Sequence, residues 1–290
     1  MRLIDQSKSK LVILALALLP ITMHAQSLIT VPRYDDADEY LPEAEKKNVD
    51  GVHLFLKQQP GEETWTAISE RRVSVKVIAH IPETAKAGVI IFPGGSGQLS
   101  MTADDRLDRS FNFSGRSRSY YWPLGLATFL VDAPSDHLDK TGLTAKFRAS
   151  PEFATDMRAV ISMIRQKFGK PLHAVGHSNG AIAVATVAAM HDLPLSSYTL
   201  VGPNYSSTDT VANTSYTKPV FIVENSEDTC KLSNASGIDA LSKSINAPSM
   251  KVSWIDGGKN ILGGPCGPFS RHSFIGVENL AIQTVAASLP

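Results

Sequence analysis

The chain has 290 residues, 28 of them basic and 28 acidic, so its formal net charge is zero. A nucleic-acid-binding protein normally carries an excess or a stripe of basic residues, and this balance argues against that class. Glycine (20 residues) and proline (17) are close to their average abundance, which excludes a collagen-like or broadly disordered chain. The length suits one α/β domain of about 250 residues with a large core.

The first 25 residues have the features of a secretory signal peptide. Three basic side chains open the chain: Arg2, Lys8 and Lys10. The apolar run that follows, residues 11–19, is shorter than the roughly 20 residues needed to span a bilayer, which favours a cleaved signal over an uncleaved anchor. Cleavage after Ala25 places the large Met23 at the −3 position, whereas cleavage after Ser27 places Ala25 there.

An exported protein, periplasmic or extracellular, is therefore expected, with no integral membrane segment after signal cleavage. Removing residues 1–25 takes away three basic residues and one acidic residue, so the remaining chain has a net charge of about −2. Residues 26–50 are polar and acidic, which predicts a loosely held segment. No repeat or low-complexity linker divides the rest, so residues 51–290 are expected to form a single domain.

The chain has two cysteines, Cys230 and Cys266. An even number of cysteines in an exported protein predicts one disulfide, and two unpaired buried thiols are the alternative. A zinc site needs about four nitrogen or sulfur ligands at compact spacing, and the sequence has no such cluster. We expect no metal and no cofactor.

Two segments near the start of the domain alternate between apolar and polar residues. Residues 52–57 and 72–81 show the period of two that half-buried antiparallel strands produce. From residue 88 the strand signals become continuous apolar runs, as expected for parallel strands covered on both faces. These runs are residues 89–92, 127–131, 172–175 and 220–223, and a further strand is expected at 251–255.

The clearest helical pattern lies between the second and third of these runs. Ser150 precedes Pro151, a combination typical of a helix cap and first turn, and apolar residues then recur on one face until Gly169. An antiparallel start followed by alternating strands and helices predicts an α/β fold with a mostly parallel sheet and helices on both faces.

A Gly-x-Ser-x-Gly motif, residues 176–180, directly follows the predicted strand 172–175. A run of small residues after the motif continues as a helix, so the sequence predicts a strand, a tight turn and a helix. This is the setting of a nucleophile elbow, in which Ser178 projects from the strand end toward helix N–H groups that favour an oxyanion. The alternative is a tight glycine turn that carries an ordinary serine.

A serine nucleophile needs a base and an orienting carboxylate, which in this architecture follow it in the order acid, then histidine. Asp228 lies just past the predicted strand 220–223, and Glu227 and Asp256 compete with it. His272 is the one histidine after the last predicted strand. Two further acids, Asp132 and Asp136, precede the serine and are expected to fix loops.

Glycines also follow the first predicted parallel strand, in the run Phe-Pro-Gly-Gly-Ser-Gly at residues 92–97. Such a loop lets the backbone approach the substrate and donates an oxyanion N–H, here that of Gly95 or Ser96. The N–H of Asn179 is the expected second donor. The glycines could instead belong to a phosphate-binding loop, but neither Gly-x-Gly-x-x-Gly nor Gly-x-x-x-x-Gly-Lys-Ser/Thr is present, so a phosphate-binding site is not expected.

These motifs resemble the α/β-hydrolase superfamily, and in detail a group of exported bacterial serine α/β hydrolases with little assigned function. The resemblance rests on residues 92–97, 112–113, 116–118, 132–136, 176–180, 228–230, 265–266 and 271–278. One departure is Phe92-Pro93, where many lipases carry His-Gly. The resemblance implies a serine hydrolase and does not imply a particular substrate.

The expected function is hydrolysis of a small-molecule carboxylic ester through a Ser-His-Asp triad and an acyl-enzyme. Two alternatives remain: a serine peptidase or other acyl-bond hydrolase, and a noncatalytic binding module on the same fold. Substrate contacts are expected from residues 98–122, whose arginines are expected to pair mainly with nearby acids. Ester or acyl substrates are the expected partners, nucleic acid is not, and the sequence does not predict an oligomeric state.

Overall fold

The computed structural model describes residues 28–30, 53–99, 101, 106–107, 112–261 and 263–290. The predicted signal peptide lies outside the described residues, as does the acidic segment 26–50 apart from β1 (Leu28–Thr30). Within the described part, no helix combines the length and the apolar character that crossing a bilayer requires.

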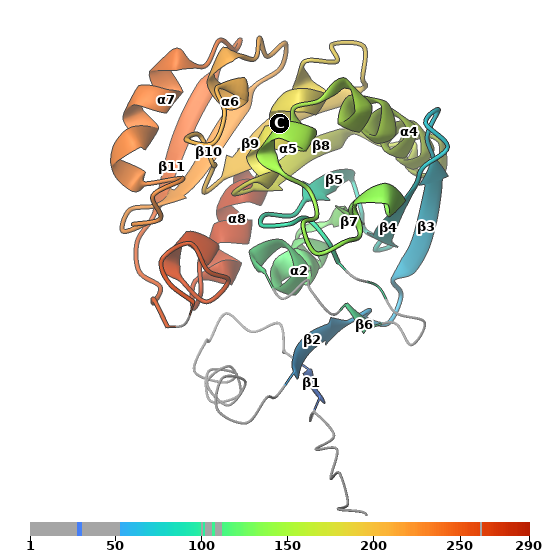
Figure 1. The fold of residues 1–290 in the computed structure, drawn as a ribbon, viewed down its shortest axis with the longest axis horizontal. Helices are drawn as coiled ribbons and strands as arrows, with labels where there is room; N and C mark the ends of the chain where they lie inside the picture. The colour runs from blue at the N-terminus through green and yellow to red at the C-terminus, as the bar shows by residue number, and fades with distance from the viewer. Residues whose placement is uncertain (1–27, 31–52, 100, 102–105, 108–111, 262) are drawn as a thin grey trace, which may run out of the picture.

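An eight-stranded sheet forms the centre of the molecule (Figure 1). Its strands are β3 (Glu63–Ile68), β4 (Ser74–His80), β5 (Ala87–Phe92), β7 (Leu126–Val131), β8 (Leu172–His177), β9 (Leu195–Val201), β10 (Val220–Asn225) and β11 (Met250–Ile255). Their spatial order is β11-β10-β9-β8-β5-β7-β4-β3. β4 is antiparallel to both of its neighbours and all other adjacent pairs are parallel, which confirms the predicted sheet.

The two segments with alternating apolar and polar residues lie in different sheets. β2 (His53–Lys57) is a strand, but it lies in a separate small sheet, parallel to β1 and antiparallel to β6 (Arg106–Leu107). β4 instead pairs with β3, which the sequence analysis missed together with β9. β3 is an edge strand that buries only Trp65 and Ala67, so its apolar signal is weak. β9 buries polar residues such as Ser197 and Thr199, which interrupt its apolar run.

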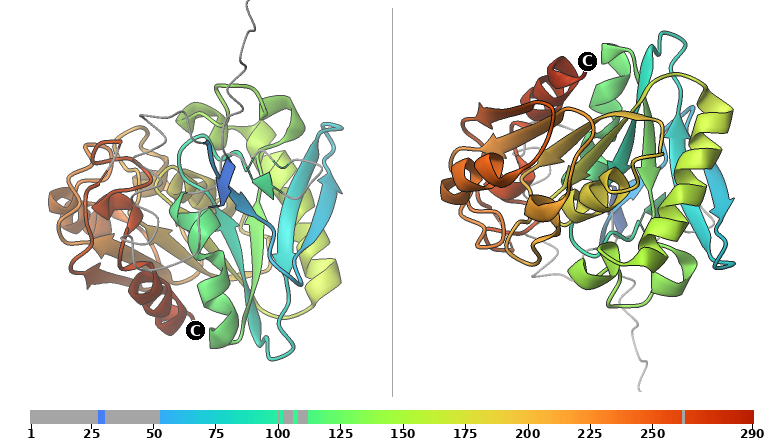
Figure 2. Two further views of the ribbon diagram at one scale, coloured as in Figure 1. Left: turned by 90° about the horizontal axis from the view of Figure 1, so that it is seen from below. Right: turned by 90° about the horizontal axis from the view of Figure 1, so that it is seen from above.

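Helices cover both faces of the sheet, as predicted (Figure 2). One hydrophobic cluster joins the sheet to the helices of the first face: α3 (Ala145–Arg148), α4 (Pro151–Phe168), α5 (Gly180–Ala188), α6 (Thr210–Asn213) and α7 (Ile238–Ser244). A second cluster lies on the other face, under α2 (Phe113–Ser117), the 3-10 helix Arg118–Leu124 and α8 (Glu278–Ser288).

The ends of α4 lie where the sequence predicts them. The Ser150 side chain accepts a hydrogen bond from the N–H of Phe153 (3.2 Å), and Gly169 ends the helix with φ of 72°. The strands β5, β8 and β10 are mutually parallel through β9, so their carboxyl ends meet at one edge of the sheet. The loops that leave this edge carry the candidate site.

Candidate active site

The turn between β8 and α5 holds Ser178 in a conformation that is rare for a residue with a side chain. Its φ is 55°, in the left-handed region. A Cβ on Gly176 would overlap the carbonyl group of Gly180, and a Cβ on Gly180 would overlap the carbonyl oxygen of Phe92. Glycine is therefore required at both flanking positions, while the backbone strain falls on the serine. Strain of this kind is typically retained at functional sites.

His272 and Asp228 form a buried pair. His272 Nδ1 lies 2.7 Å from Asp228 Oδ2, and the two side chains are 2% and 0% exposed. The competing acid Glu227 is 54% exposed and forms an ion pair with Arg271 at 3.1 Å. Asp256, the other competitor, accepts a hydrogen bond from the exposed Ser226 hydroxyl at 2.6 Å. Of the three acids proposed from the sequence, Asp228 is the one that contacts His272.

A serine that the sequence analysis missed completes this pair. Ser233 Oγ lies 2.9 Å from His272 Nδ1 and donates a hydrogen bond to Asp228 Oδ2 (3.3 Å). The N–H of Cys230 donates to the other carboxylate oxygen, Asp228 Oδ1 (2.7 Å). The Asp228 carboxylate is thus oriented by donors on both oxygens. Ser233 lies in a loop without a motif, so nothing in the sequence singles it out.

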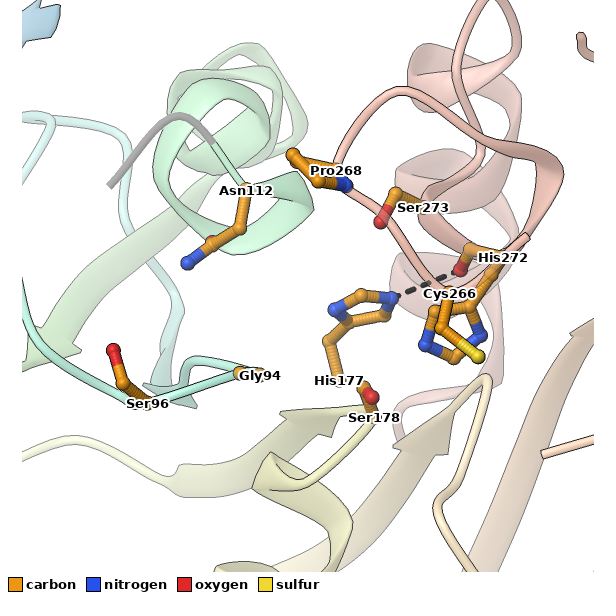
Figure 3. A pocket seen from close by; sticks show the side chains of 10 residues that line it. Gly94, Ser96, Asn112, His177, Ser178, Cys266, Pro268, His272 and Ser273 are labelled. Atoms are coloured by element: carbon orange, nitrogen blue, oxygen red, sulfur yellow. Dashed lines mark hydrogen bonds between the residues drawn. The ribbon is translucent and has the colours of Figure 1, made fainter. Parts of the chain in front are cut away.

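One pocket brings together the candidate nucleophile, base and glycine loop (Figure 3). Its volume is about 220 Å³. Ser178 and His272 both line it, although they come from segments 94 residues apart in the sequence. The other lining residues are Gly94, Gly95, Ser96, Asn112, His177, Cys266, Pro268 and Ser273.

The glycine loop after β5 forms a tight turn against the elbow. The N–H of Gly97 donates to the carbonyl of Gly94 (3.0 Å), and Gly95 has φ of 58°. A Cβ on Gly94 would lie 2.9 Å from Ser178 Cβ, so glycine is needed for this close approach. Among the hydrogen bonds of the described residues, none uses the backbone N–H of Gly95, Ser96 or Asn179. Gly95 and Ser96 line the pocket and Asn179 directly follows Ser178, so these N–H groups can serve a ligand.

Side-chain amides link the glycine loop to the elbow. Asn179 Nδ2 donates to the carbonyl of Gly95 (3.0 Å), and Asn204 Nδ2 donates to Asn179 Oδ1 (2.5 Å). The backbone N–H of Asn204 also donates to the carbonyl of Ser178 (3.1 Å). This chain of contacts fixes the orientation of the Gly95–Ser96 peptide relative to the serine.

The two arginines that follow Asn112 are engaged with acids, as the sequence analysis expected. Arg116 Nε lies 2.8 Å from Glu278 Oε1, and both side chains are buried. The same guanidinium donates to the backbone carbonyls of Pro268 (2.9 Å) and Ser273 (2.6 Å). Arg116 therefore fixes the position of the segment 268–273, which contains the candidate base His272. Arg118 pairs in the same way with Glu62 (2.6 Å).

His177, next to the candidate nucleophile, also contacts the base segment. Its Nε2 lies 2.9 Å from the backbone carbonyl oxygen of His272, which can only accept, so Nε2 carries the proton. Burial, with a smaller contribution from the charge of His272, lowers the pKa of His177 well below its usual value. His177 is therefore a neutral donor that ties the elbow to the base segment.

The acids outside the pocket have structural partners. Asp132 Oδ1 accepts the N–H groups of Leu99 (2.8 Å) and Ala133 (2.7 Å), and burial raises its pKa to about 6. Asp136 forms an ion pair with Arg71. Both acids thus hold loops, as expected from the sequence. The part of the chain that the structure describes contains no group of three or more histidine, cysteine and acidic side chains placed to hold a metal.

Cys230 and Cys266 form a disulfide, which confirms the sequence prediction. The two residues are 36 positions apart. Cys230 holds the Asp228 carboxylate through its N–H, and Cys266 lines the pocket six residues before His272. The bond therefore joins the segment of the candidate acid to that of the candidate base.

Replacing both cysteines by serine is expected to lower the free energy of unfolding by up to about 4 kcal/mol, because the bond joins residues 36 positions apart and so restricts the unfolded chain. Urea unfolding of wild type and of the double variant, each with and without reductant, measures this. Reductant should destabilise the wild type and leave the variant unchanged. Equal midpoints for oxidised wild type and variant would show that the disulfide does not stabilise the fold.

Comparison with known proteins identifies the fold. No protein-family profile matches the chain, and no curated protein is significantly similar in sequence. An α/β serine hydrolase homologue from Coxiella burnetii is 17% identical, with a TM-score of 0.54 over 77% of this chain and 97% of that chain. Dienelactone hydrolase from Anabaena variabilis is 14% identical, with a TM-score of 0.56 over 79% and 100% of the respective chains.

Est1E from Butyrivibrio proteoclasticus, in a structure with bound ferulic acid, is 17% identical, with a TM-score of 0.53 over 76% of this chain and 98% of that chain. The three structures are matched over nearly their whole length, although fewer than one residue in five is identical. The strand order, the elbow and the helices on both faces agree with this likeness. The chain has the α/β-hydrolase fold.

Proposed function

We propose that this protein is a serine hydrolase that cleaves small-molecule carboxylic esters. The observation that carries the proposal is a buried Asp228–His272 pair in the same pocket as Ser178, whose backbone is held at a strand–helix turn with positive φ. The likeness to a serine hydrolase homologue, to dienelactone hydrolase and to a structure with bound ferulic acid supports a hydrolase.

In the proposed reaction, Ser178 Oγ attacks the ester carbonyl carbon while His272 Nε2 takes the hydroxyl proton. Because Nδ1 faces Asp228, Nε2 is the nitrogen available to the substrate side. The C–O bond to the leaving group then breaks, and His272 returns the proton to the departing alkoxide. Water, activated by the same nitrogen, hydrolyses the acyl-enzyme and restores the serine. Asp228 stabilises the imidazolium that forms in each half-reaction.

The oxyanion of each tetrahedral intermediate is assigned to backbone N–H groups at the pocket. Asn179, the residue after Ser178 at the start of α5, contributes one donor. Gly95 or Ser96, both of which line the pocket, contributes the second. Donors that are already oriented before the reaction stabilise developing charge without reorganising, and loss of one typically costs 10²- to 10³-fold in kcat.

Asn179→Ala keeps the backbone donor but removes the side-chain link to Gly95. We expect kcat to fall between roughly 10- and 100-fold with little change in KM, because a displacement of about 1 Å in the catalytic geometry can cost 10²-fold. Steady-state kinetics on a short ester measures both parameters. Ser207→Ala, at the far end of the same amide network, is the control and should be mild. A rise in KM alone would mean that Asn179 binds substrate instead.

We also propose that the protein is exported and works as a single domain over residues 51–290. The disulfide supports export, because such bonds persist in oxidising compartments outside the cytoplasm. N-terminal sequencing of the protein secreted or released from its native host tests the signal peptide. A mature start between residues 26 and 28 supports the proposal, whereas a retained Met1 would contradict it.

A panel of p-nitrophenyl esters of increasing acyl length, run beside a peptide p-nitroanilide, tests the substrate class. A pocket of about 220 Å³ is smaller than typical ligand sites, so acetate and butyrate esters should be turned over faster than long-chain esters. Comparable kcat/KM on the anilide would favour a peptidase. Absence of turnover on every substrate, with the protein folded, would favour a binding module.

A further inference from the structure

Glu224, near the end of β10, is a fully buried carboxyl group beside the candidate acid. It is 0% exposed. Its Oε1 accepts the N–H of Asn225 (2.8 Å), whereas its Oε2 accepts no hydrogen bond from any residue that the structure describes. The carbonyl of Asn225 accepts the N–H of Asp228 (3.0 Å), and this turn brings Asp228 back to the strand end. An ionised carboxylate with one donor is costly to bury.

The two neighbouring carboxyls differ in the donors that they receive. Asp228 accepts hydrogen bonds from the N–H of Cys230, the Ser233 hydroxyl and His272 Nδ1. Glu224 accepts one. Burial, followed by the negative charge of Asp228, raises the pKa of Glu224 well above its usual value. Hydrogen bonds to the charged form favour ionisation, and Glu224 receives only one, so Glu224 is the carboxyl of the pair that is expected to keep a proton.

We propose that Glu224 is a positioning residue: a neutral carboxylic acid whose Oε2–H donates to the Asp228 carboxylate and keeps it aimed at His272. This inference rests on the proposed function, since it assigns Asp228 as the acid of the triad. The donated hydrogen bond explains how Oε2, a buried oxygen that accepts no hydrogen bond from any described residue, is accommodated at the strand end. The same hydrogen bond withdraws electron density from the Asp228 carboxylate. Asp228 therefore stabilises the protonated form of His272 less strongly than it would without this donor.

The other titratable groups around the pair do not replace this donor. Burial raises the pKa of Tyr205, and its hydroxyl donates to the carbonyl of Asn234 (2.7 Å). His177 is neutral and donates to the His272 backbone. Arg116 is paired with Glu278, and Glu227 with Arg271, as described above.

The first test compares Glu224→Gln with Glu224→Leu, using Glu227→Gln as the exposed control. Glutamine is neutral and keeps a donor, so it should leave the acidic limb of the kcat/KM profile in place. Leucine removes the donor, so kcat should fall by roughly 10-fold or more and the acidic limb should move to higher pH by roughly half a unit. Glu227→Gln should change neither.

Two results would overturn the inference. A shift of the acidic limb to lower pH in Glu224→Gln would mean that Glu224 is ionised, because the substitution would then remove a negative charge near His272. A wild-type rate and pH profile in Glu224→Leu would mean that the donor has no role. If the leucine variant does not fold, the glutamine variant still decides the protonation state.

Infrared spectroscopy separates this inference from the proposed function. The difference spectrum between wild type and Glu224→Gln at pH 7 should contain the carbonyl-stretching band of a protonated carboxylic acid. That band requires no substrate. Its presence in a protein without esterase activity would contradict the proposed function but still support a protonated Glu224 beside Asp228. Carboxylate bands alone would overturn the inference whatever the activity.

Discussion

Ser178→Ala is expected to lower kcat for ester hydrolysis by about 10⁶-fold. Removing the nucleophile of a triad leaves only the contributions of the oxyanion donors and of substrate binding, and losses of this size are typical of serine hydrolases. KM should change little, because the Oγ atom contributes mainly to the transition state. The measurement is kcat from initial rates with a short p-nitrophenyl ester.

The fold of this variant is expected to be intact. Alanine keeps the Cβ that packs against Gly94 and leaves the hydrogen bond from the Ser178 N–H to the Val201 carbonyl (2.9 Å) unchanged. Unfolding curves of the two proteins should therefore nearly coincide. A variant that retains more than about a hundredth of the wild-type kcat would contradict the nucleophile assignment, because removal of the nucleophile should cost far more than about 100-fold.

Asp228→Asn is expected to lower kcat by roughly 10⁴-fold. The amide can present its N–H to His272 Nδ1, which favours the tautomer that carries its proton on Nε2. That nitrogen can then no longer accept the proton of Ser178. Ser233 Oγ, 2.9 Å from Nδ1, offers a neutral acceptor that cannot replace the negative charge beside an imidazolium.

Glu227→Gln is the matched control for this prediction. Its side chain is exposed and pairs with Arg271, so the substitution removes the same charge one position away without touching His272. The expected change in kcat is less than about 3-fold, in line with the small energies of exposed ion pairs. If Glu227→Gln were the more damaging of the two, the acid of the triad would have to be reassigned.

The parts of the site that the sequence predicts are those set by local order along the chain. Glycine at 176 and 180 marks a turn with close backbone contacts, and the chain order of serine, acid and histidine selects His272 from eight histidines. The position just past a strand favours Asp228. Each of these inferences needs only neighbours in sequence or the order of elements.

The parts of the site that the sequence does not predict depend on contacts between distant segments. Ser233 reaches His272 from 39 residues away, and the position of Glu224 beside Asp228 depends on the turn after β10. The pairing of the strands is not predicted for the same reason. The period of two indicates that β2 and β4 are strands, but it does not indicate that β4 pairs with β3. The sequence also leaves the oxyanion donor open between Gly95 and Ser96.

The central claim, that this pocket performs acyl transfer on a serine, is tested most directly by a fluorophosphonate probe. Such probes react with a serine only when its neighbouring base makes it nucleophilic. We predict one adduct per chain, located by peptide mass spectrometry on Ser178, with loss of labelling in Ser178→Ala and strong slowing in Asp228→Asn. Equal labelling of wild type and Ser178→Ala, or an adduct on another serine, would contradict the account.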